Sequence, residues 1–185
     1  MTTRIETDRL VIRTFVSDDG PHWVDLVSDP EVLRFLPASA PPSLERFARV
    51  LADRTAMEAE IGYSMWAVDE RATGAFVGQC GIRPIDEGTG PEVDLAYHFF
   101  PATWGKGYAT EAATAVLDHG LRVLGLRRII AVVAPENTGS WRVIEKAGMR
   151  YVGEVDYYGM AGLKLYEAER SWWVTNPQPR RPFRG

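Results

Sequence analysis

The sequence is short of the residues that form disulfides and metal sites. Cys80 is the only cysteine among 185 residues, and there are three histidines. A single thiol cannot close an internal disulfide, and the Cys/His spacings typical of structural zinc sites are absent. We therefore expect a fold without a metal, held together by a hydrophobic core that a chain of this length is able to bury.

Long apolar runs and clustered positive charge are missing as well. No segment approaches the roughly 18 consecutive apolar residues of a membrane-spanning helix, and residues 1–11 carry four charged side chains where a signal peptide would be apolar. With 21 basic and 25 acidic residues, the net charge of −4 provides no broad basic surface for nucleic acid. We expect a cytoplasmic protein that binds neither membranes nor nucleic acid.

What is present is typical of one globular domain, with 45% apolar and 25% charged residues. We place this domain at residues 1–175 and expect the proline- and arginine-rich segment 176–185 to be a flexible tail. Strands are expected at 10–15, 63–68, 75–83, 93–100, 128–134, 151–158 and 163–169. Helices are expected at about 17–27, from 43 onward, at 108–124 and at about 137–147. This order predicts a mixed α+β or α/β fold around one twisted sheet.

The most informative segment lies between the strand that ends at Phe100 and the helix that begins at Tyr108. Gly105 and Gly107 permit backbone angles that turn successive amides toward one point. The first amides of the next helix lack partners within it and lie at the positive end of its dipole. This pattern is typical of a phosphate or pyrophosphate site, to which Lys106 adds a cation. Alternatively, the two glycines only make a tight turn.

Two common phosphate-binding loops do not fit this segment. In a Walker loop the lysine follows the second glycine, whereas Lys106 lies between the two glycines. A dinucleotide-binding loop would have a third glycine at Thr110 and an acidic residue about 20 positions further on, and Glu136 lies too far along the chain.

Residues 104–109, Trp-Gly-Lys-Gly-Tyr-Ala, resemble the acetyl-coenzyme A pyrophosphate loop of the GCN5-related N-acetyltransferases (GNAT), whose pattern is Gln/Arg-x-x-Gly-x-Gly/Ala. Trp104 departs from the first position of that pattern, as members of the RimJ/RimL-like subgroup often do. Residues 6–13 resemble the opening strand of that subgroup, and residues 137–149 resemble its second coenzyme-side helix. The resemblance extends over about residues 5–169.

The resemblance implies the GNAT fold, a mostly antiparallel twisted sheet of about six or seven strands with a parallel pair at the coenzyme site and about four flanking helices. It implies direct transfer of an acetyl group from acetyl-CoA, the co-substrate, to an amine in a ternary complex. The acceptor in the subgroup is the N-terminal α-amine of a protein or peptide. A polyamine or aminoglycoside acceptor and a non-catalytic acyl-CoA-binding module are the alternatives, and the resemblance also allows a homodimer.

By this resemblance the coenzyme lies along the glycine loop, the main chain at the end of the preceding strand, and the second helix. The expected coenzyme-binding residues are Phe99, Phe100, Trp104, Gly105, Lys106, Gly107, Tyr108, Ala109, Thr110, Asn137 and Ser140. Phe99 and Phe100 would act through their main chain, and Asn137 also suits the cap of its helix.

Acetyl transfer to an amine needs a neutral amine, a polarised thioester carbonyl and a protonated leaving thiolate. Glu92 and Asp94 project from one face of a strand together with His98, by the period of two. The resemblance favours Asp94 as the general base, acting through water, with Glu92 and His98 as the other candidates. An aspartate must be buried to serve as a base near neutral pH; alternatively, Asp94 is a solvated carboxylate.

The general acid and the acceptor contacts are less well defined by sequence. Many family members have a tyrosine seven residues after the asparagine that opens the helix, but here that position is Ile144, which cannot donate a proton. Ser140 matches the serine of the RimL-like subgroup and is the candidate acid, although a coenzyme thiolate can also leave without one. Phe35 and Trp141 are the aromatic side chains expected to contact the acceptor, while Trp23, Trp66, Trp172 and Trp173 are expected in the core.

Overall fold

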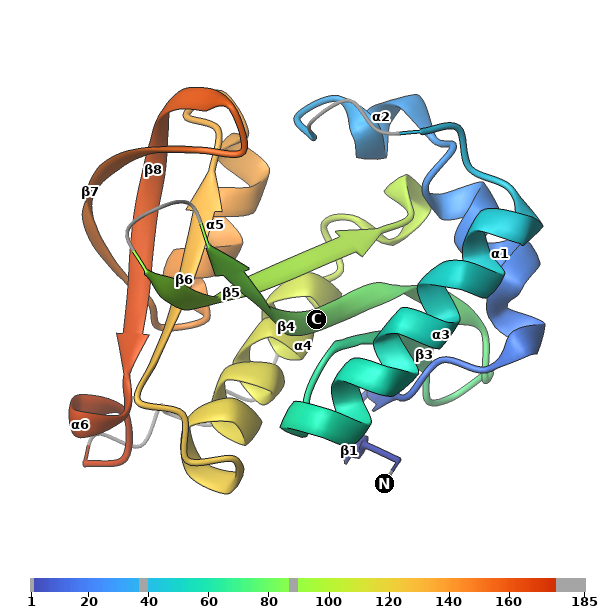
Figure 1. Ribbon diagram of the computed structural model, residues 1–185, viewed down its shortest axis with the longest axis horizontal. Coiled ribbons are helices and arrows are strands. Elements are labelled where there is room, and N and C mark those ends of the chain that lie inside the picture. Colours follow the sequence, from blue (N-terminus) through green and yellow to red (C-terminus); the bar gives the residue numbers. More distant parts are fainter. Residues whose placement is uncertain (1, 37–39, 87–89, 176–185) are drawn as a thin grey trace.

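The computed structural model describes residues 2–36, 40–86 and 90–175, and these form one eight-stranded sheet in the order β1-β2-β3-β4-β5-β6-β8-β7 (Figure 1). The strands are β1 (Arg4–Glu6), β2 (Leu10–Arg13), β3 (Met65–Glu70), β4 (Phe76–Asp86), β5 (Pro91–Phe99), β6 (Arg128–Val133), β7 (Arg150–Tyr157) and β8 (Met160–Glu169). Neighbouring strands are antiparallel except for β5 and β6, which are parallel. The expected mostly antiparallel sheet with one parallel pair is confirmed.

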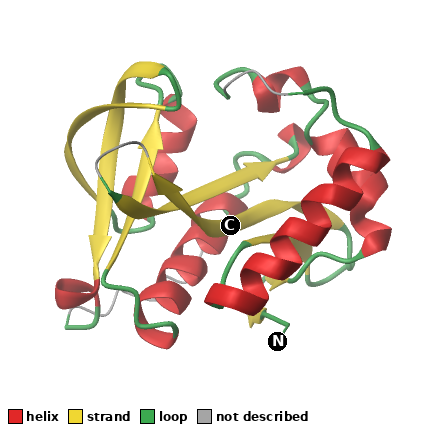
Figure 2. Ribbon diagram, in the orientation of Figure 1, coloured by secondary structure: helices red, strands yellow, loops and turns green. Residues whose placement is uncertain are grey.

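The helices lie on both faces of this sheet, as Figure 2 shows. They are α1 (Gly20–Leu26), α2 (Pro30–Leu33), α3 (Leu44–Ile61), α4 (Tyr108–Asp118), α5 (Thr138–Lys146) and α6 (Arg170–Trp173). Ser43 caps α3 by accepting a hydrogen bond from the Arg46 amide, as the sequence leads one to expect at a helix that begins there. In the described part of the chain, no helix has both the length and the apolarity to cross a bilayer.

The alternation of side chains along β3 divides the core into two layers. Trp66 and Val68 belong to the larger cluster under α4, whereas Ala67 faces the aromatic cluster of α1 and α3. In the larger cluster, Ala112, Ala113, Val116 and Leu117 of α4 are fully buried against the sheet. Each large aliphatic or aromatic side chain buried in this way contributes about 1.5–3 kcal/mol to stability.

The larger cluster requires a glycine at the end of the long helix. Beyond α4 the chain continues as a wider π-helical turn, His119–Val123, so the expected helix of 108–124 is correct in extent. A Cβ at Gly120 would approach the Cδ1 atom of Ile129 to 2.6 Å, which is closer than real carbon contacts. The glycine therefore sets how closely this turn packs on β6.

Short elements account for the differences from the sequence-based expectation. The eighth strand is β1, whose three residues pair with β2 and are too few to show an alternating pattern. The expected loop at 29–40 contains the one-turn helix α2, capped by Asp29, and α6 follows β8 without a break. The expected tail, 176–185, lies outside the described residues.

The feature that creates the functional site is the divergence of β5 from β6. Their parallel ladder has a single register pair, Asp94 with Ile130, in the described chain. Beyond it β6 pairs with β8 on its other side, and Figure 1 shows the carboxyl ends of β5 and β6 separating. The main chain of β5 from Leu95 to Phe99 therefore has an edge without a strand partner on the β6 side.

Candidate active site

A cleft of about 650 Å³ lies where β5 and β6 diverge. Its walls come from the last residues of β5 and β6, the loop and first turn of α4, and α5. The α2 region, the hairpin between β7 and β8, and Arg83 of β4 complete them. This volume is within the usual range for pockets that bind small molecules and cofactors. Elements far apart in sequence thus form one continuous site.

The glycine loop forms one end of this cleft. Gly105 and Gly107 have φ angles of 76° and 80°, in the left-handed region that favours glycine. Gly107 is also the N-cap of α4, where no side chain bonds to the first amides of the helix. Tyr108, Ala109 and Thr110 line the cleft, and the first amides of a helix, which lack partners within it, suit the diphosphate of a coenzyme.

A buried carboxylate anchors this loop to the start of the sheet. Glu111, in the first turn of α4, is 5% exposed and accepts hydrogen bonds from the Thr7 hydroxyl at 2.6 Å and the Arg9 amide at 2.9 Å. The Arg9 guanidinium pairs with it at 2.7 Å and also donates to the Lys106 carbonyl at 2.8 Å. The charge on Glu111 also complements the positive end of α4.

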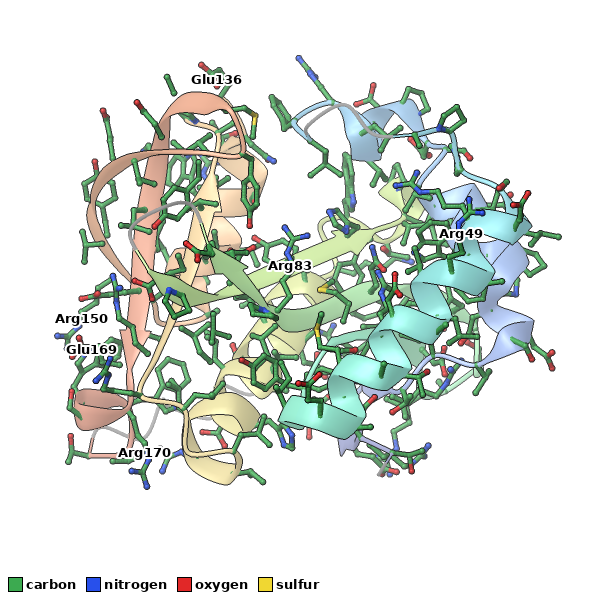
Figure 3. All side chains as sticks on the ribbon, viewed as in Figure 1. Arg49, Arg83, Glu136, Arg150, Glu169 and Arg170 are labelled. Carbon is green, nitrogen blue, oxygen red and sulfur yellow. The ribbon has the colours of Figure 1, made fainter. Side chains whose placement is uncertain are left out.

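Asp94 lies deeper in the cleft, and only 4% of its side chain is exposed. The Tyr158 hydroxyl donates to Oδ2 at 2.9 Å, and the Arg83 guanidinium lies 3.3 Å from the same oxygen (Figure 3 labels Arg83). Burial raises the pKa of Asp94 to about 6, against the opposing effects of Arg83, Tyr158 and the Val132 amide. The second oxygen, Oδ1, has no hydrogen bond of ordinary geometry within the described chain.

Tyr158 is a site residue that the sequence did not indicate. It has a φ of 58°, and no other residue besides glycine among those described has a positive φ. This conformation occurs at the tip of the β7–β8 hairpin, and it costs about 1–3 kcal/mol in a non-glycine residue. The pair Tyr158-Gly159 indicates a turn in the sequence, but nothing local shows that its ring reaches Asp94, 64 positions earlier.

The other candidate bases have different surroundings. Glu92 forms an ion pair with Arg128, which also pairs with Glu167 at 2.8 Å, and Glu92 is not among the residues that line the cleft. His98 does line the cleft, but burial and the charges of Arg83 and Arg54 lower its pKa to about 4. An imidazole of such low basicity is a poor acceptor for the proton of an ammonium group.

The first turn of α5 contributes a pair of hydroxyl groups. Asn137 caps this helix by accepting a hydrogen bond from the Ser140 amide at 3.1 Å. The Tyr97 hydroxyl lies 2.8 Å from both the carbonyl and the hydroxyl oxygen of Ser140. Burial raises the pKa of Tyr97, so this phenol keeps its proton at neutral pH. Ile144, at the family's usual tyrosine position, is buried at 2% exposure.

The cleft brings together most, but not all, of the residues expected from sequence. Nine of the expected coenzyme residues line it, and these are Phe99, Trp104, Gly105, Gly107, Tyr108, Ala109, Thr110, Asn137 and Ser140. Phe35 also lines it, while Lys106, Phe100 and Trp141 do not. Trp141 packs against the larger core cluster and lies beneath Lys164, whose Nζ is 4.7 Å from the ring centre. The binding roles of all these residues remain predictions.

A glycine loop at a helix N-terminus and a buried carboxylate thus lie in one cleft, where two parallel strands diverge. Residues 9–150 match the family model described as an acetyltransferase (GNAT) domain. The chain belongs to the GNAT acetyltransferase family, and it is an N-acetyltransferase by this membership. It is 33% identical to YkkB of Bacillus subtilis (strain 168) over 150 residues, which are 80% of this chain and 86% of YkkB.

Solved structures agree with this family assignment. A GNAT-family acetyltransferase from Bacillus anthracis has 27% identity and a TM-score of 0.75, with 91% of this chain and 99% of that chain covered. RimJ of Mycobacterium smegmatis in complex with CoA-disulfide (21% identity, TM-score 0.76, coverage 96% and 94%) shares the fold. So does a spermidine N-acetyltransferase from Vibrio cholerae in complex with CoA and spermine (16%, 0.75, 91% and 99%). The fold therefore does not distinguish between acceptors.

Proposed function

We propose that this protein transfers the acetyl group of acetyl-CoA directly to the N-terminal α-amine of a peptide or protein, with both substrates bound at once. The observation that carries the proposal is the continuity of the cleft, which runs from the amides of the glycine loop to the carboxyl group of Asp94. The diphosphate at one end and the amine at the other would thus meet along the free edge of β5.

Acetyl-CoA is proposed to bind with its diphosphate on the amides at Tyr108, Ala109 and Thr110. Its pantetheine arm would then follow the unpaired main chain of β5, where backbone amides are available to hydrogen-bond the thioester carbonyl. Polarisation of that carbonyl makes its carbon susceptible to attack by the neutral amine. The new N–C bond forms as the C–S bond breaks, which leaves a thiolate and a proton to be transferred.

Asp94 is proposed as the group that removes the proton from the amine, through an intervening water. Its pKa of about 6 lets it be ionised near neutral pH while remaining a stronger base than an exposed aspartate. Tyr158 and Arg83 both hydrogen-bond Oδ2, whereas Oδ1 has no partner of ordinary geometry among the described residues. Glu92 has no part in this proposal because Arg128 occupies it outside the cleft.

Ser140 is proposed to protonate the leaving thiolate, with Tyr97 beside it. The two hydroxyl groups lie 2.8 Å apart, so the phenol can hydrogen-bond the serine oxygen and hold it in place. Tyr97 reaches this position from β5 rather than from α5, where the family's tyrosine usually stands. The pair thus supplies a hydroxyl donor even though Ile144 cannot.

The charges that line the cleft favour an acceptor with a single positive charge. Three acidic side chains line its described walls, and these are Glu31, Asp94 and Glu136. Four basic side chains do so as well, and these are Arg34, Arg83, Arg142 and Lys146. A polyamine brings several positive charges that this lining does not neutralise, whereas a peptide α-amine brings one.

An acceptor screen tests the proposal. Purified protein is incubated with acetyl-CoA and one of four acceptors. These are a short neutral peptide, the same peptide with a blocked N-terminus and an internal lysine, spermidine, and an aminoglycoside. The release of free thiol measures the transfer. We expect transfer to the free peptide and little to the others. Preference for spermidine or the aminoglycoside would contradict the choice of acceptor but not the acetyltransferase activity.

The second candidate function is a non-catalytic acyl-CoA-binding module, which the burial of Ile144 at the usual tyrosine position favours. Tight binding of acetyl-CoA together with no thiol release across the whole acceptor panel would support this alternative. Thiol release above the rate of spontaneous hydrolysis with any of the amines would exclude it.

A further inference from the structure

A hydrogen-bond relay of three polar side chains lies behind one wall of the cleft. Arg54 of α3 donates from Nη2 to Oε1 of Gln79 on β4 at 3.0 Å. Nε2 of Gln79 is 2.8 Å from Nδ1 of His98 on β5. Gln79 is 3% exposed, while His98 lines the cleft. The proton transfers proposed above use none of these three residues.

The relay runs in one direction because Arg54 can only donate. A guanidinium has no acceptor atom, so Gln79 must present its carbonyl oxygen to Arg54 and its amide nitrogen to His98. Since the amide nitrogen also only donates, Nδ1 of His98 must be the unprotonated acceptor. A neutral His98 ring therefore carries its proton on Nε2.

His98 is neutral at physiological pH, and its Nε2 atom is available. Burial and the nearby charges of Arg54 and Arg83 lower the pKa of His98 to about 4, so the imidazolium form is absent near pH 7. Nε2 makes no hydrogen bond with any described residue, yet it is not among the buried polar atoms that lack a partner. Because His98 lines the cleft, Nε2–H is open to a ligand there.

The start of the relay is itself fixed in place. The Arg54 guanidinium lies over the ring of Phe15, 4.7 Å from its centre, and burial lowers its pKa to about 10. Arg54 forms no ion pair with a carboxylate in the described chain, so its clearest polar role is the bond to Gln79. A buried charge is costly, and its use here is to orient a single amide.

His98 and Asp94 point from the same face of β5 with Ala96 between them, and all three line the cleft. Their Cα atoms are four residues apart, which is about 13 Å along a strand. An acceptor can bridge these two side chains if a water links its amine to the Asp94 carboxylate and its carbonyl oxygen accepts a hydrogen bond from Nε2–H. The three hydrogen bonds, together with about 3 Å between the amine and the oxygen of the acceptor, span about 11 Å. That separation of amine and oxygen is found in α-amino carbonyl compounds.

We infer that His98, held as an Nε2–H donor by Gln79 and Arg54, binds an oxygen of the acceptor, and that the acceptor is an α-amine with a carbonyl or carboxylate on the neighbouring carbon. The inference rests on the proposed acetyl transfer and specifies its acceptor. Polyamines and simple alkylamines offer no such oxygen, and they leave the buried donor without a partner, which costs binding free energy.

The first test measures the tautomer directly and does not depend on activity. In long-range ¹H–¹⁵N spectra of the ¹⁵N-labelled protein near pH 7, we expect His98 to show an unprotonated Nδ1 and a protonated Nε2. Its signals are assigned by their loss in His98→Ala. In Gln79→Glu a carboxylate oxygen faces Nδ1, so the proton should move there or the ring should become charged. A protonated Nδ1 in the unaltered protein would overturn the inference.

The second test compares alaninamide with sec-butylamine, which lacks the carbonyl group. We expect His98→Ala to lower kcat/KM for alaninamide about tenfold, the loss of one ordinary hydrogen bond, and to change that for sec-butylamine less than twofold. Comparing the two proteins on each acceptor cancels the different basicities of the amines. His22→Ala, on the exposed surface of α1, is the matched control and should change neither.

Equal losses for both acceptors in His98→Ala would overturn the role of His98 in acceptor recognition. Absence of transfer to either acceptor by the unaltered protein would instead contradict the proposed function, and the acceptor assignment with it. The tautomer measured by NMR separates these two failures, because it is observed in the resting protein.

Discussion

Asp94 combines burial with two hydrogen-bond donors, and the balance between them sets its pKa. Burial is the largest effect and raises the pKa to about 6, while Arg83 and Tyr158 oppose it. An exposed carboxylate such as that of an ordinary surface aspartate would be too weak a base for this role. The usefulness of this residue therefore comes from its position more than from its type.

The first prediction concerns the pH dependence of turnover. The ionised carboxylate is the active form, so kcat should rise with pH through about 6 as Asp94 loses its proton. Asp94→Asn should lower kcat by roughly 10²–10⁴ and remove this acidic limb. The measurement is kcat against pH at saturating substrates. If Glu92→Gln removed the acidic limb and Asp94→Asn kept it, the base would be Glu92.

The second prediction concerns Tyr158. Its hydroxyl stabilises the ionised form of Asp94, so Tyr158→Phe should raise the pKa of Asp94 and move the acidic limb to higher pH. The ring and the packing of the hairpin are retained in this variant. A limb at unchanged pH would show that the hydroxyl does not act on Asp94.

The glycine loop and α4 act as one element. The left-handed glycines expose the first amides, and Glu111 holds the same turn against residues 7–9 of the β1–β2 connection. The loop is therefore preformed, and coenzyme binding need not order it.

The third prediction is that Gly107→Glu abolishes acetyl-CoA binding, weakening it by more than about a hundredfold. A side chain at φ 80° is strained, and its carboxylate would stand where the diphosphate is expected. Gly74→Glu is the matched control, because Gly74 has a φ of 71° and open space around it in the β3–β4 turn. Isothermal titration calorimetry with acetyl-CoA checks both variants. Unchanged affinity in Gly107→Glu would place the diphosphate elsewhere.

The fourth prediction is that Glu111→Gln destabilises the fold by roughly 2 kcal/mol, because it removes the buried negative charge that pairs with the Arg9 guanidinium. For a chain of this length, that is a fall in Tm of about 4–8 °C. Glu45→Gln removes the exposed pair with Arg49 and should cost under about 0.5 kcal/mol. Thermal unfolding of both variants checks the prediction. An equally small fall in Tm in the two variants would contradict the role of Glu111 in anchoring the glycine loop.

The whole molecule consists of two halves joined along β5 and β6. Figure 1 shows α1, α2 and α3 in one half and β7, β8 and α5 in the other. Residues of α2 and of α5 and the β7–β8 hairpin line the cleft from the two halves. A ligand that bridges the halves should therefore stabilise the entire fold.

The fifth prediction is that acetyl-CoA raises Tm by about 5–10 °C at a hundred times its dissociation constant, whereas NAD and ATP do not. Binding to the native state alone adds about 2.7 kcal/mol under these conditions, and this converts to that shift for a chain of 185 residues. Differential scanning fluorimetry measures it. A larger shift with NAD or ATP would contradict the assignment of the glycine loop.

Local patterns in the sequence determined the parts of this protein that depend on neighbouring residues. The glycine loop depends on the backbone freedom of Gly105 and Gly107, and the helices and strands depend on periods of two to four residues. These patterns therefore predicted the helices, most strands and the glycine loop. The short elements β1, α2 and α6 were not predicted, because three or four residues are too few to show a period.

Only the tertiary structure decided which side chains meet in the cleft. Asp94 and Glu92 are equivalent by strand alternation, and the fold alone buries one beside Tyr158 while it pairs the other with Arg128. The bonds from Tyr97 to Ser140 and from Gln79 to His98 likewise join residues of different elements. Burial, charge and hydrogen-bond direction are properties of these long-range contacts, and a local pattern does not contain them.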